Sequence, residues 1–317
     1  MKTSKPKHIV CLTPVYNDWQ SLYHLAEEMA QIQTKIQNYI FSIYAINDGS
    51  NEKCFFDEAF LTQHRINIIN LKINVGHQRA IAIGLQYLNY ELKHNKNQDT
   101  YICVLDSDGE DKPEDIIPMQ LQAKDKIVFA KRVKRSENYQ FKLGYSLYKL
   151  LFKILTGIKM DYGNFSVIPF YYLDHVAAQP SIWNHYAASI TSSKIPVTSI
   201  ATHRGQRYAG NSKMNFKNLI IHGLSAISVY FDTLCFRILK FSLFSLVFCI
   251  VGISIVLYKK YISLQAVPGW ASSLILISIS IIIQLFSVTF IILLFQLTRR
   301  KNIDPLNMKL YKKYIKK

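Results

Sequence analysis

The sequence predicts an α/β fold, a mostly parallel doubly wound sheet, followed by a pair of membrane-spanning helices. Two observations predict this architecture. Short apolar runs alternate with helix-length segments through residues 1–215, as in a parallel sheet that is covered on both faces. Two long stretches without a charged residue then follow, Phe241–Tyr258 and Tyr261–Thr298. With 317 residues, the chain has room for one large domain or two smaller ones.

Each expected strand is a short run of apolar residues in which β-branched and aromatic side chains are common. The expected strands are His8–Thr13, Ile40–Ile46, Ile66–Leu71, Tyr101–Leu105 and Ile127–Ala130. Helices are predicted at Ser21–Gln37 and His77–His94, and Pro113 is suited to the first turn of a further short helix.

Polar residues follow every one of these strands. They are Asn17-Asp18, Asn47-Asp48, Asn74–Gly76, Asp106–Asp111 and Lys131–Arg135. Ligands of doubly wound sheets bind beyond the carboxyl ends of the strands. We therefore expect a ligand site at this edge of the sheet.

The two uncharged stretches are predicted to be transmembrane helices. A helix of 18 residues is about 27 Å long, close to the ~30 Å thickness of the hydrocarbon core of a bilayer. Pro268-Gly269 lies between the stretches and favours a turn, so the two helices would form a hairpin. A buried helical hairpin in a soluble core is the alternative.

Basic residues predict the orientation of the hairpin. The segment 298–317 carries eight Lys and Arg residues against one acid, Asp304, whereas the hairpin loop has Lys259 and Lys260. The positive-inside rule then places the tail and the N-terminal domain in the cytoplasm, on the inner (cytoplasmic) membrane. The expected organisation is a cytoplasmic domain (1–215), a juxtamembrane helix (216–240), the hairpin (241–297) and a basic cytoplasmic tail (298–317).

A further segment is predicted to lie on the membrane without crossing it. In Phe141–Gly157, Lys142, Ser146, Lys149 and Lys153 recur at helical spacing and form a basic stripe among apolar residues. Such a helix suits the headgroup interface, and we assign it to residues 137–157. A core helix with its lysines in water is the alternative.

The formal net charge of +17 is compatible with a nucleic acid, an anionic membrane or a polyphosphate as partner. Two membrane spans beside a basic tail favour anionic membrane lipid, and no nucleic-acid partner is expected. The five cysteines show neither paired nor metal-ligand spacing, which fits a reducing compartment.

Asp106-Ser107-Asp108 directly follows an apolar strand. Two carboxylates in this place can chelate a hard divalent cation, Mg²⁺ or Mn²⁺, which also accepts phosphate oxygens as ligands. The same pattern occurs in ordinary acidic turns. Here Glu110 and Asp111 follow in an otherwise basic chain, which favours the cation site. Asn47-Asp48-Gly49-Ser50 by itself has the chemistry of a turn.

The loop His203–Lys213 precedes the expected juxtamembrane helix. Its basic residues Arg204, Arg207 and Lys213 could clasp a pyrophosphate, since Arg binds phosphate in a bidentate manner and Lys acts as a point charge. The alternative is a juxtamembrane loop that is held to anionic lipid.

Taken in order, five segments resemble the motifs of family 2 glycosyltransferases of the GT-A type. Thr13–Asp18 resembles the motif P-V-Y-N-E, Asn47–Ser50 resembles D-D-G-S, and Asn74–Ala80 resembles N-x-G-h-x-x-A. Asp106–Asp111 resembles D-A-D-L-Q-D, and Arg204–Lys213 resembles R-x-x-R-x-x-G-x-S-K. Together with the C-terminal pair of spans, the chain looks most like the polyprenyl-phosphate glycosyltransferases, the group of dolichyl-phosphate mannose synthase and bacterial undecaprenyl-phosphate glucosyltransferases. The resemblance covers nearly the whole chain.

The resemblance implies a role for each motif residue. The residues implied to bind the nucleotide-sugar are Pro14, Tyr16, Asp18, Asp48, Gly76 and Asp106. The implied ligands of Mg²⁺ or Mn²⁺ are Asp106, Asp108 and Glu110, and the acceptor phosphate would face Arg132 and Arg135. The residues implied to be catalytic are Asp106, Asp108, Arg207 and Lys213. Three departures stand out: Asp18 replaces Glu, Glu110 replaces Gln, and Glu52 stands one place later than the usual acid.

The implied reaction is an inverting transfer from a UDP- or GDP-linked sugar to a polyprenyl phosphate at the cytoplasmic membrane face. A phosphate monoester has its second pKa at about 6, so this acceptor needs no general base. Two alternatives stay open. One is transfer to a hydroxyl of a lipid-linked oligosaccharide or polysaccharide, and the other is an inactive, membrane-anchored nucleotide-sugar-binding protein. The sequence is also compatible with a homo-oligomer.

Overall fold

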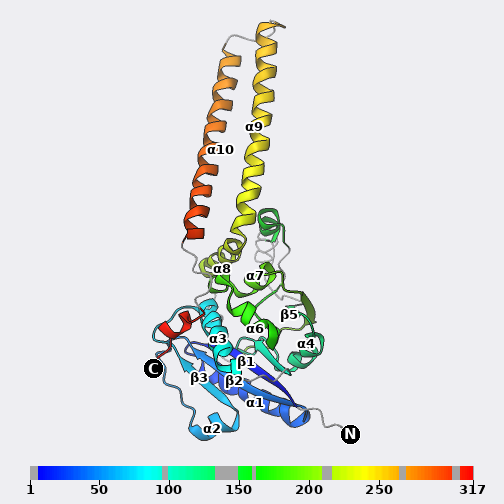
Figure 1. Cartoon of the computed structure of the whole chain (residues 1–317), viewed down its shortest axis with the longest axis vertical. Helices are drawn as coiled ribbons and strands as arrows, with labels where there is room; N and C mark the ends of the chain where they lie inside the picture. Colours follow the sequence, from blue (N-terminus) through cyan, green and yellow to red (C-terminus); the bar gives the residue numbers. More distant parts are fainter. Residues whose placement is uncertain are drawn as a thin grey trace. The chain divides into compact units, whose positions relative to one another are not determined.

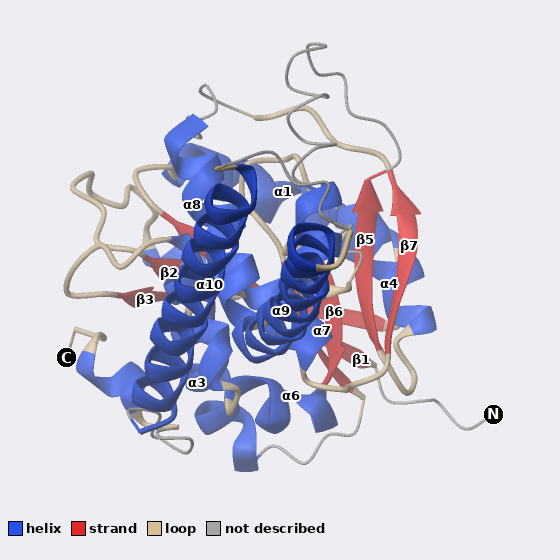
Figure 2. Ribbon diagram, turned by 90° about the horizontal axis from the view of Figure 1, so that it is seen from above, coloured by secondary structure: helices blue, strands red, loops and turns tan. Residues whose placement is uncertain are grey.

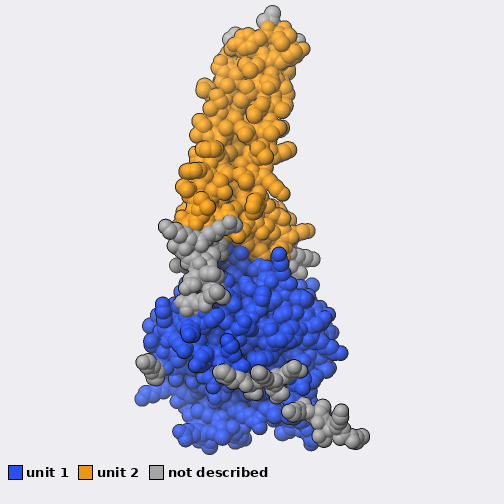
Figure 3. All heavy atoms as spheres, viewed as in Figure 1, with its two compact units in different colours: residues 1–149, 159–229, 304–317 blue, residues 150–158, 230–303 orange. Residues whose placement is uncertain are grey.

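The structure, a computed structural model, describes residues 6–94, 99–132, 149–158, 162–208, 216–263, 269–301 and 308–316. The chain divides into two compact units, coloured separately in Figure 3. Unit 1 comprises residues 1–149, 159–229 and 304–317, and unit 2 comprises residues 150–158 and 230–303. Each unit is described by itself.

Unit 1 is built on a seven-stranded sheet with the strand order β3-β2-β1-β4-β6-β5-β7. The strands are β1 (Lys7–Val15), β2 (Tyr39–Asn47), β3 (Ile66–Asn70), β4 (Thr100–Val104), β5 (Ile127–Arg132), β6 (Ser166–Pro169) and β7 (Val197–Thr202). Pairing is parallel except where β6 lies antiparallel between β4 and β5. Figure 2 shows β5 and β7 side by side, and these two strands are parallel. The predicted mostly parallel sheet is confirmed.

Helices cover both faces of the sheet. They are α1 (Trp19–Lys35), α2 (Glu58–Gln63), α3 (His77–Glu91), α4 (Ile116–Gln122), α6 (Phe170–Ala177) and α7 (Tyr186–Ser192) (Figure 1). In β1, Ile9 and Cys11 face the core beneath α1 and α4, and Val10 and Leu12 face the core beneath α3, α6 and α7. This explains why β1 is a continuous apolar run rather than an alternating one.

The C-terminal segment 308–316 is part of unit 1. Tyr311 in the short helix η4 (Leu310–Lys313) is buried, and its N–H donates to Gln86 Oε1 on α3 at 3.3 Å. Beyond it, Ile315 forms an antiparallel bridge with Leu71 just after β3. Residues 308–316 of the predicted basic tail therefore pack against the sheet domain.

The sheet domain ends with α8 (Phe216–Val229), and unit 2 contains α9 (Phe231–Tyr261) and α10 (Trp270–Lys301). The predicted juxtamembrane helix 216–240 is thus divided at Tyr230 between α8 and α9. Both α9 and α10 are long and apolar enough to cross a membrane. They pack against each other, with Ser242 Oγ 2.8 Å from Thr289 Oγ1.

Unit 2 also holds part of the segment that was predicted to lie on the membrane. Residues 149–156 are helical, and residues 137–148 of the predicted helix lie outside the described part of the chain. Phe152 is buried and packs edge-on against Tyr230, with ring centroids 5.8 Å apart. Leu150 and Ile154 remain more than half exposed, as expected for a helix with an apolar face toward lipid. Pro268 of the predicted turn lies outside the described residues.

Candidate active site

Two loops that are distant in the sequence meet at the carboxyl edge of the sheet. The loop 105–112 follows β4, and the loop 203–208 follows β7. Gly205 N–H donates to Glu110 O at 2.9 Å, and Tyr208 N–H donates to Asp108 O at 2.9 Å. A Cβ atom on Gly205 would lie 2.1 Å from Gly109 O, so only glycine permits this close approach.

The contact between the two loops brings three arginines to three carboxylates. Arg207 Nη2 lies 2.6 Å from Asp108 Oδ2 and 3.3 Å from Glu110 Oε1. Arg204 pairs with the same Glu110 oxygen. Arg132, at the end of β5, lies 3.2 Å from Asp111 Oδ1 and 3.6 Å from Glu110 Oε2. The structure therefore brings together Asp106, Asp108, Glu110, Arg132 and Arg207, whereas Arg135 and Lys213 lie outside the described residues.

The carboxylates of this cluster differ in their pKa values. Burial raises the pKa of Asp111 to about 7, and the charge of Asp106 acts in the same direction. Burial also raises the pKa of Asp108. Burial acts likewise on Glu110, but Arg204 and the other arginines outweigh it and leave the pKa of Glu110 below its usual value. The cluster thus holds strongly ionised and weakly ionised carboxylates side by side.

The two oxygens of Asp106 have different surroundings. Oδ1 is buried and lies 3.2 Å from Nε2 of His77. The side chain as a whole is 33% exposed. Burial alone would raise the pKa of Asp106, but His77, followed by Arg132 and Arg207, lowers it, and the carboxylate is ionised at neutral pH.

This set of side chains fits a divalent cation that shares its ligands with a substrate. Among the described residues, no three His, Cys, Asp or Glu side chains converge into a complete metal site. Asp106 and Asp108 nevertheless supply the carboxylate oxygens that Mg²⁺ and Mn²⁺ prefer, and the Asp106 side chain is 33% exposed. Mg²⁺ in particular binds through one or two carboxylates plus substrate phosphates, which matches this pair.

The loops after β1 and β2 adjoin each other at the same edge. Asn17 Oδ1 accepts hydrogen bonds from the N–H groups of Asn51 at 2.9 Å and Glu52 at 3.2 Å. Pro14, Tyr16 and Asp18 lie in or next to the first of these loops, and Tyr16 is exposed. The structure thus places these three residues beside the loop that carries Asp48.

Asp48 itself holds the entry to α3. Its Oδ1 accepts from Val75 N–H at 2.7 Å, and its Oδ2 accepts from Gly76 N–H at 3.0 Å. Gly76 has a φ of +88°, a conformation that glycine adopts at no steric cost. Asp48 therefore fixes the backbone of the N-x-G motif.

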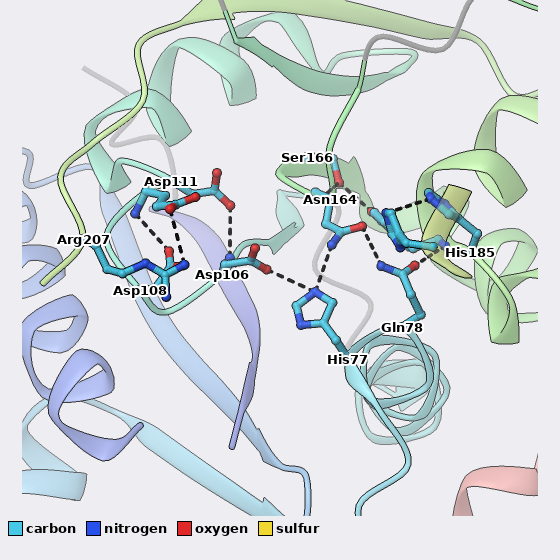
Figure 4. Close-up of polar contacts among 12 residues, drawn as sticks. His77, Gln78, Asp106, Asp108, Asp111, Asn164, Ser166, His185 and Arg207 are labelled. Atoms are coloured by element: carbon cyan, nitrogen blue, oxygen red, sulfur yellow. Dashed lines mark hydrogen bonds and ion pairs between the residues drawn. The ribbon is translucent and has the colours of Figure 1, made fainter. Parts of the chain in front are cut away.

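A chain of polar side chains that was not predicted from the sequence begins at Asp106 and His77. Asn164 Nδ2 lies 2.9 Å from His77 Nε2, and Gln78 Nε2 donates to Asn164 Oδ1 at 3.1 Å (Figure 4). Tyr186 N–H, at the start of α7, donates to Gln78 Oε1 at 2.6 Å. His77 and Gln78 lie in a motif that the sequence singled out, but no local pattern points to Asn164.

Comparisons with known proteins show which chains are similar to this one. A family model described as glycosyl transferase family 2 matches residues 10–176. The uncharacterized glycosyltransferase YkcC of Bacillus subtilis is 26% identical over 84% of this chain and 81% of its own length. The uncharacterized glycosyltransferase sll0501 of Synechocystis is 21% identical over 83% and 82%. Among solved structures, mannosyl-3-phosphoglycerate synthase from Rubrobacter xylanophilus matches with a TM-score of 0.48 and 11% identity, covering 70% of this chain and 72% of that one.

Proposed function

Because the chain belongs to glycosyl transferase family 2, we propose that it transfers a sugar from a nucleotide-sugar to a polyprenyl phosphate. The observation that carries the proposal is the juxtaposition of Asp106 and Asp108 with Arg132 and Arg207 at one edge of the sheet. The carboxylates suit a cation on the donor diphosphate, and the arginines suit the phosphates of donor and acceptor.

The chemistry follows from the charges of these side chains. An acceptor phosphate is already ionised at neutral pH, so the main barrier is the departure of the nucleoside diphosphate. A Mg²⁺ or Mn²⁺ ion held by Asp106 and Asp108, with Glu110 beside them, would supply Lewis-acid stabilisation of the charge that develops there. Arg207 adds a fixed positive charge for the leaving diphosphate, and Arg132 receives the attacking phosphate. Attack from the face opposite the leaving group inverts the anomeric centre.

The remaining assigned residues complete the donor and acceptor sites in this proposal. Pro14, Tyr16, Asp18 and Asp48 would hold the nucleoside, with Gly76 close to its phosphates. Lys213 would close over the donor, and Arg135 would assist Arg132. The exposure of Tyr16 and the position of its loop beside Asp48 support the nucleoside assignment.

The arrangement of the chain supports a hairpin with both of its ends on one side of the membrane, and the basic tail favours the cytoplasmic side. The helices α9 and α10 belong to unit 2, whereas α8 before them and residues 308–316 after them belong to unit 1. Two crossings would therefore leave the sheet domain and the C-terminus on one side. Reporter fusions at Lys317 and Val267 are expected to report opposite sides of the membrane, and a tail that reports the outer side would contradict this topology.

A second candidate function rests on His77. A partly exposed imidazole beside a carboxylate has the form of a general base with its orienting partner, which a hydroxyl acceptor would need. In that case the acceptor would be an oligosaccharide or polysaccharide hydroxyl. The nature of the product separates the two functions.

The test uses membranes that contain the full chain, undecaprenyl phosphate, and a panel of radiolabelled UDP- and GDP-sugars. We expect label to enter the lipid extract in a product that mild acid hydrolyses and mild base leaves intact, as for a sugar phosphodiester. A labelled product that survives mild acid would favour the hydroxyl acceptor. No transfer from any donor to lipid or to glycan would favour an inactive binding protein.

A further inference from the structure

A glutamine occupies the middle of the second candidate membrane span. Gln284 on α10 is the central residue of the 29-residue apolar segment Trp270–Thr298, and its side chain is exposed. At a rise of 1.5 Å per residue it lies about 21 Å from either end of that segment, whereas half of the hydrocarbon core of a bilayer measures about 15 Å. A crossing by α10 therefore puts this amide in hydrocarbon, too deep for its side chain to reach water on either side.

The amide of Gln284 has no hydrogen-bond partner among the residues that the structure describes. The other glutamine of α10 differs in this respect, because Gln296 Nε2 donates to Asp232 Oδ1 on α9 at 3.2 Å. A carboxamide that leaves water without gaining a hydrogen bond costs free energy, and lipid tails offer none. The position of Gln284 therefore favours a polar partner from outside the chain.

The helix α9 packs against the opposite side of α10 (Figure 1). Thr289, which bonds Ser242 of α9, follows Gln284 by five residues, and a helix turns about 100° per residue, so the two side chains lie on roughly opposite sides. The buried and half-buried residues on the α9 side recur at intervals of four and three. They are Ala271, Ile275, Ser278, Ile282, Leu285, Thr289, Ile292 and Gln296.

The side of α10 that carries Gln284 has the pattern of a second packing seam, here called the outer stripe. Its residues also recur at intervals of four and three, and all are exposed: Ser273, Ile277, Ser280, Gln284, Ser287, Ile291 and Leu294. This spacing is the heptad repeat of a coiled coil, with serines at three successive d positions and Gln284 between isoleucines at the a positions. Small side chains such as serine let two helices approach closely in a membrane.

We propose that the outer stripe packs against the outer stripe of a second copy of the chain, with the two Gln284 amides hydrogen-bonded to each other. The proposal rests on the membrane crossing that belongs to the proposed function. Two copies inserted in the same direction are related by a two-fold axis along the membrane normal, so residues of the same number meet at the same depth. A carboxamide is both donor and acceptor, so two of them satisfy each other.

The choice of a second copy follows from this symmetry. An unrelated helix would need a polar group at the depth of Gln284 and small residues one heptad apart, whereas a second α10 presents both. A lone polar residue at an a position also fixes the register and the number of helices in a coiled coil, which is the role we assign to Gln284. Because α9 occupies the other side of α10, the two α10 helices form the centre of the dimer and the two α9 helices flank them.

The first test measures dimerisation in lipid vesicles that contain only this protein. Full-length chains that carry a donor or an acceptor fluorophore after Lys317 are diluted with lipid, and energy transfer gives the apparent Kd. We expect Gln284→Leu, which keeps the apolar bulk and removes the amide, to raise this Kd by about tenfold or more. Gln284→Asn retains a carboxamide and should stay within about threefold of the wild type. Phe286→Leu, an exposed change away from the outer stripe, is the matched control and should match the wild type.

The second test locates the interface. Oxidation of membranes with copper phenanthroline should link Ser280→Cys chains into covalent dimers, above the level of the wild type with its native cysteines. Phe286→Cys should stay at the wild-type level. A wild type that is monomeric in vesicles, an unchanged Kd in Gln284→Leu, or equal linking at positions 280 and 286 would overturn the proposal. A monomeric wild type would also point to an unrelated membrane protein as the partner of the stripe.

A labelling control separates this inference from the proposed function. In open membrane fragments, a water-soluble maleimide should label Phe286→Cys no more than the wild type, because position 286 faces lipid. Strong labelling there would contradict the membrane crossing, and with it both the proposed topology and this dimer. Protection at position 286 with an unchanged Kd in Gln284→Leu would contradict the dimer alone. Sugar transfer by the same vesicles reports on the proposed reaction independently of the dimer.

Discussion

Arg207 Nη2 lies 2.6 Å from Asp108 Oδ2, so the arginine proposed to face the donor diphosphate is bound to a carboxylate proposed to hold its cation. Glu110 is engaged by arginines in the same way. A cation and the arginines therefore compete for the same oxygens. A diphosphate attracts arginine through charge-assisted hydrogen bonds, so its arrival would release the carboxylates to the cation.

This competition predicts that Arg207→Gln binds Mn²⁺ more tightly than the wild type in the absence of donor. We expect an increase of about fivefold, because a partly exposed ion pair is worth up to about 1 kcal/mol. Electron paramagnetic resonance of free Mn²⁺ measures the binding without any turnover. Arg79→Gln, which removes an exposed charge on α3 outside the cluster, is the control. Unchanged or weaker Mn²⁺ binding in Arg207→Gln would contradict the competition.

Asp108→Asn is predicted to lower turnover by roughly 10²-fold or more, as the loss of other electrostatic groups at reaction centres does. The substitution is nearly isosteric, so folding and membrane insertion should be retained. Sugar transfer to lipid is the measurement, and size-exclusion chromatography checks folding. The exposed Asp125→Asn should behave like the wild type. Full activity of the Asp108→Asn variant, or of the wild type in EDTA, would rule out this role.

The sequence was sufficient to predict the parallel strands whose carboxyl ends carry the candidate site. All five predicted strands are present, because buried parallel strands are continuous apolar runs, as in β1. β6 was not predicted, since four residues that end in Pro169 carry little strand signal, and it pairs with β4 and β5 through contacts distant in sequence. The break between α8 and α9 at Tyr230 was also not predicted, because the sequence pattern of residues 216–240 is helical throughout.

Within the candidate site, the sequence pointed to individual residues but not to the contacts between them. Asp106, Asp108 and Arg207 were singled out by residue type, and the structure brings them together. The contact depends on Gly109 and Gly205, whose backbones meet across almost a hundred residues. The pair of His185, which precedes α7, and His222 on α8, whose Nε2 atoms lie 3.2 Å apart, could not be found from sequence, because the two residues are 37 positions apart and no motif joins them.

The His185–His222 pair predicts that stability falls as the pH is lowered below about 6.5, the usual pKa of histidine. Burial lowers the pKa of His185 to about 3, and the charge of His222 contributes. At pH values between the pKa of His185 in the folded chain and its usual pKa, the unfolded chain binds a proton that the folded chain does not. The free energy of unfolding therefore decreases by about 1 kcal/mol for each unit by which the pH is lowered in this range.

Thermal unfolding of the full chain between pH 7.5 and 5.0 measures this effect. His185→Gln should unfold at a lower temperature at pH 7.5, because His185 caps α7, and its unfolding temperature should depend less on pH. His175→Gln is the control, and we expect its unfolding temperature to depend on pH as that of the wild type does. A wild-type pH dependence in His185→Gln would show that other groups are responsible.

Tyr311 ties the C-terminal segment to α3. The side chain is 4% exposed and packs against Tyr87 at 6.0 Å and Tyr90 at 6.1 Å between ring centroids. Tyr311→Ala should cost about 3–5 kcal/mol, as large-to-small changes of buried aromatic residues do. Because α3 begins at His77 beside Asp106, sugar transfer should fall as well. Hydrogen exchange measured by mass spectrometry on the full chain should show faster exchange in the α3 peptides.

Lys309→Ala, an exposed change in the same segment, removes a positive charge without removing packing. If the segment acted only as a basic tail on anionic lipid, Lys309→Ala would have the larger effect and α3 would keep its protection in Tyr311→Ala. We expect the reverse, because the aromatic contacts and the hydrogen bond to Gln86 make residues 308–316 a structural part of the sheet domain.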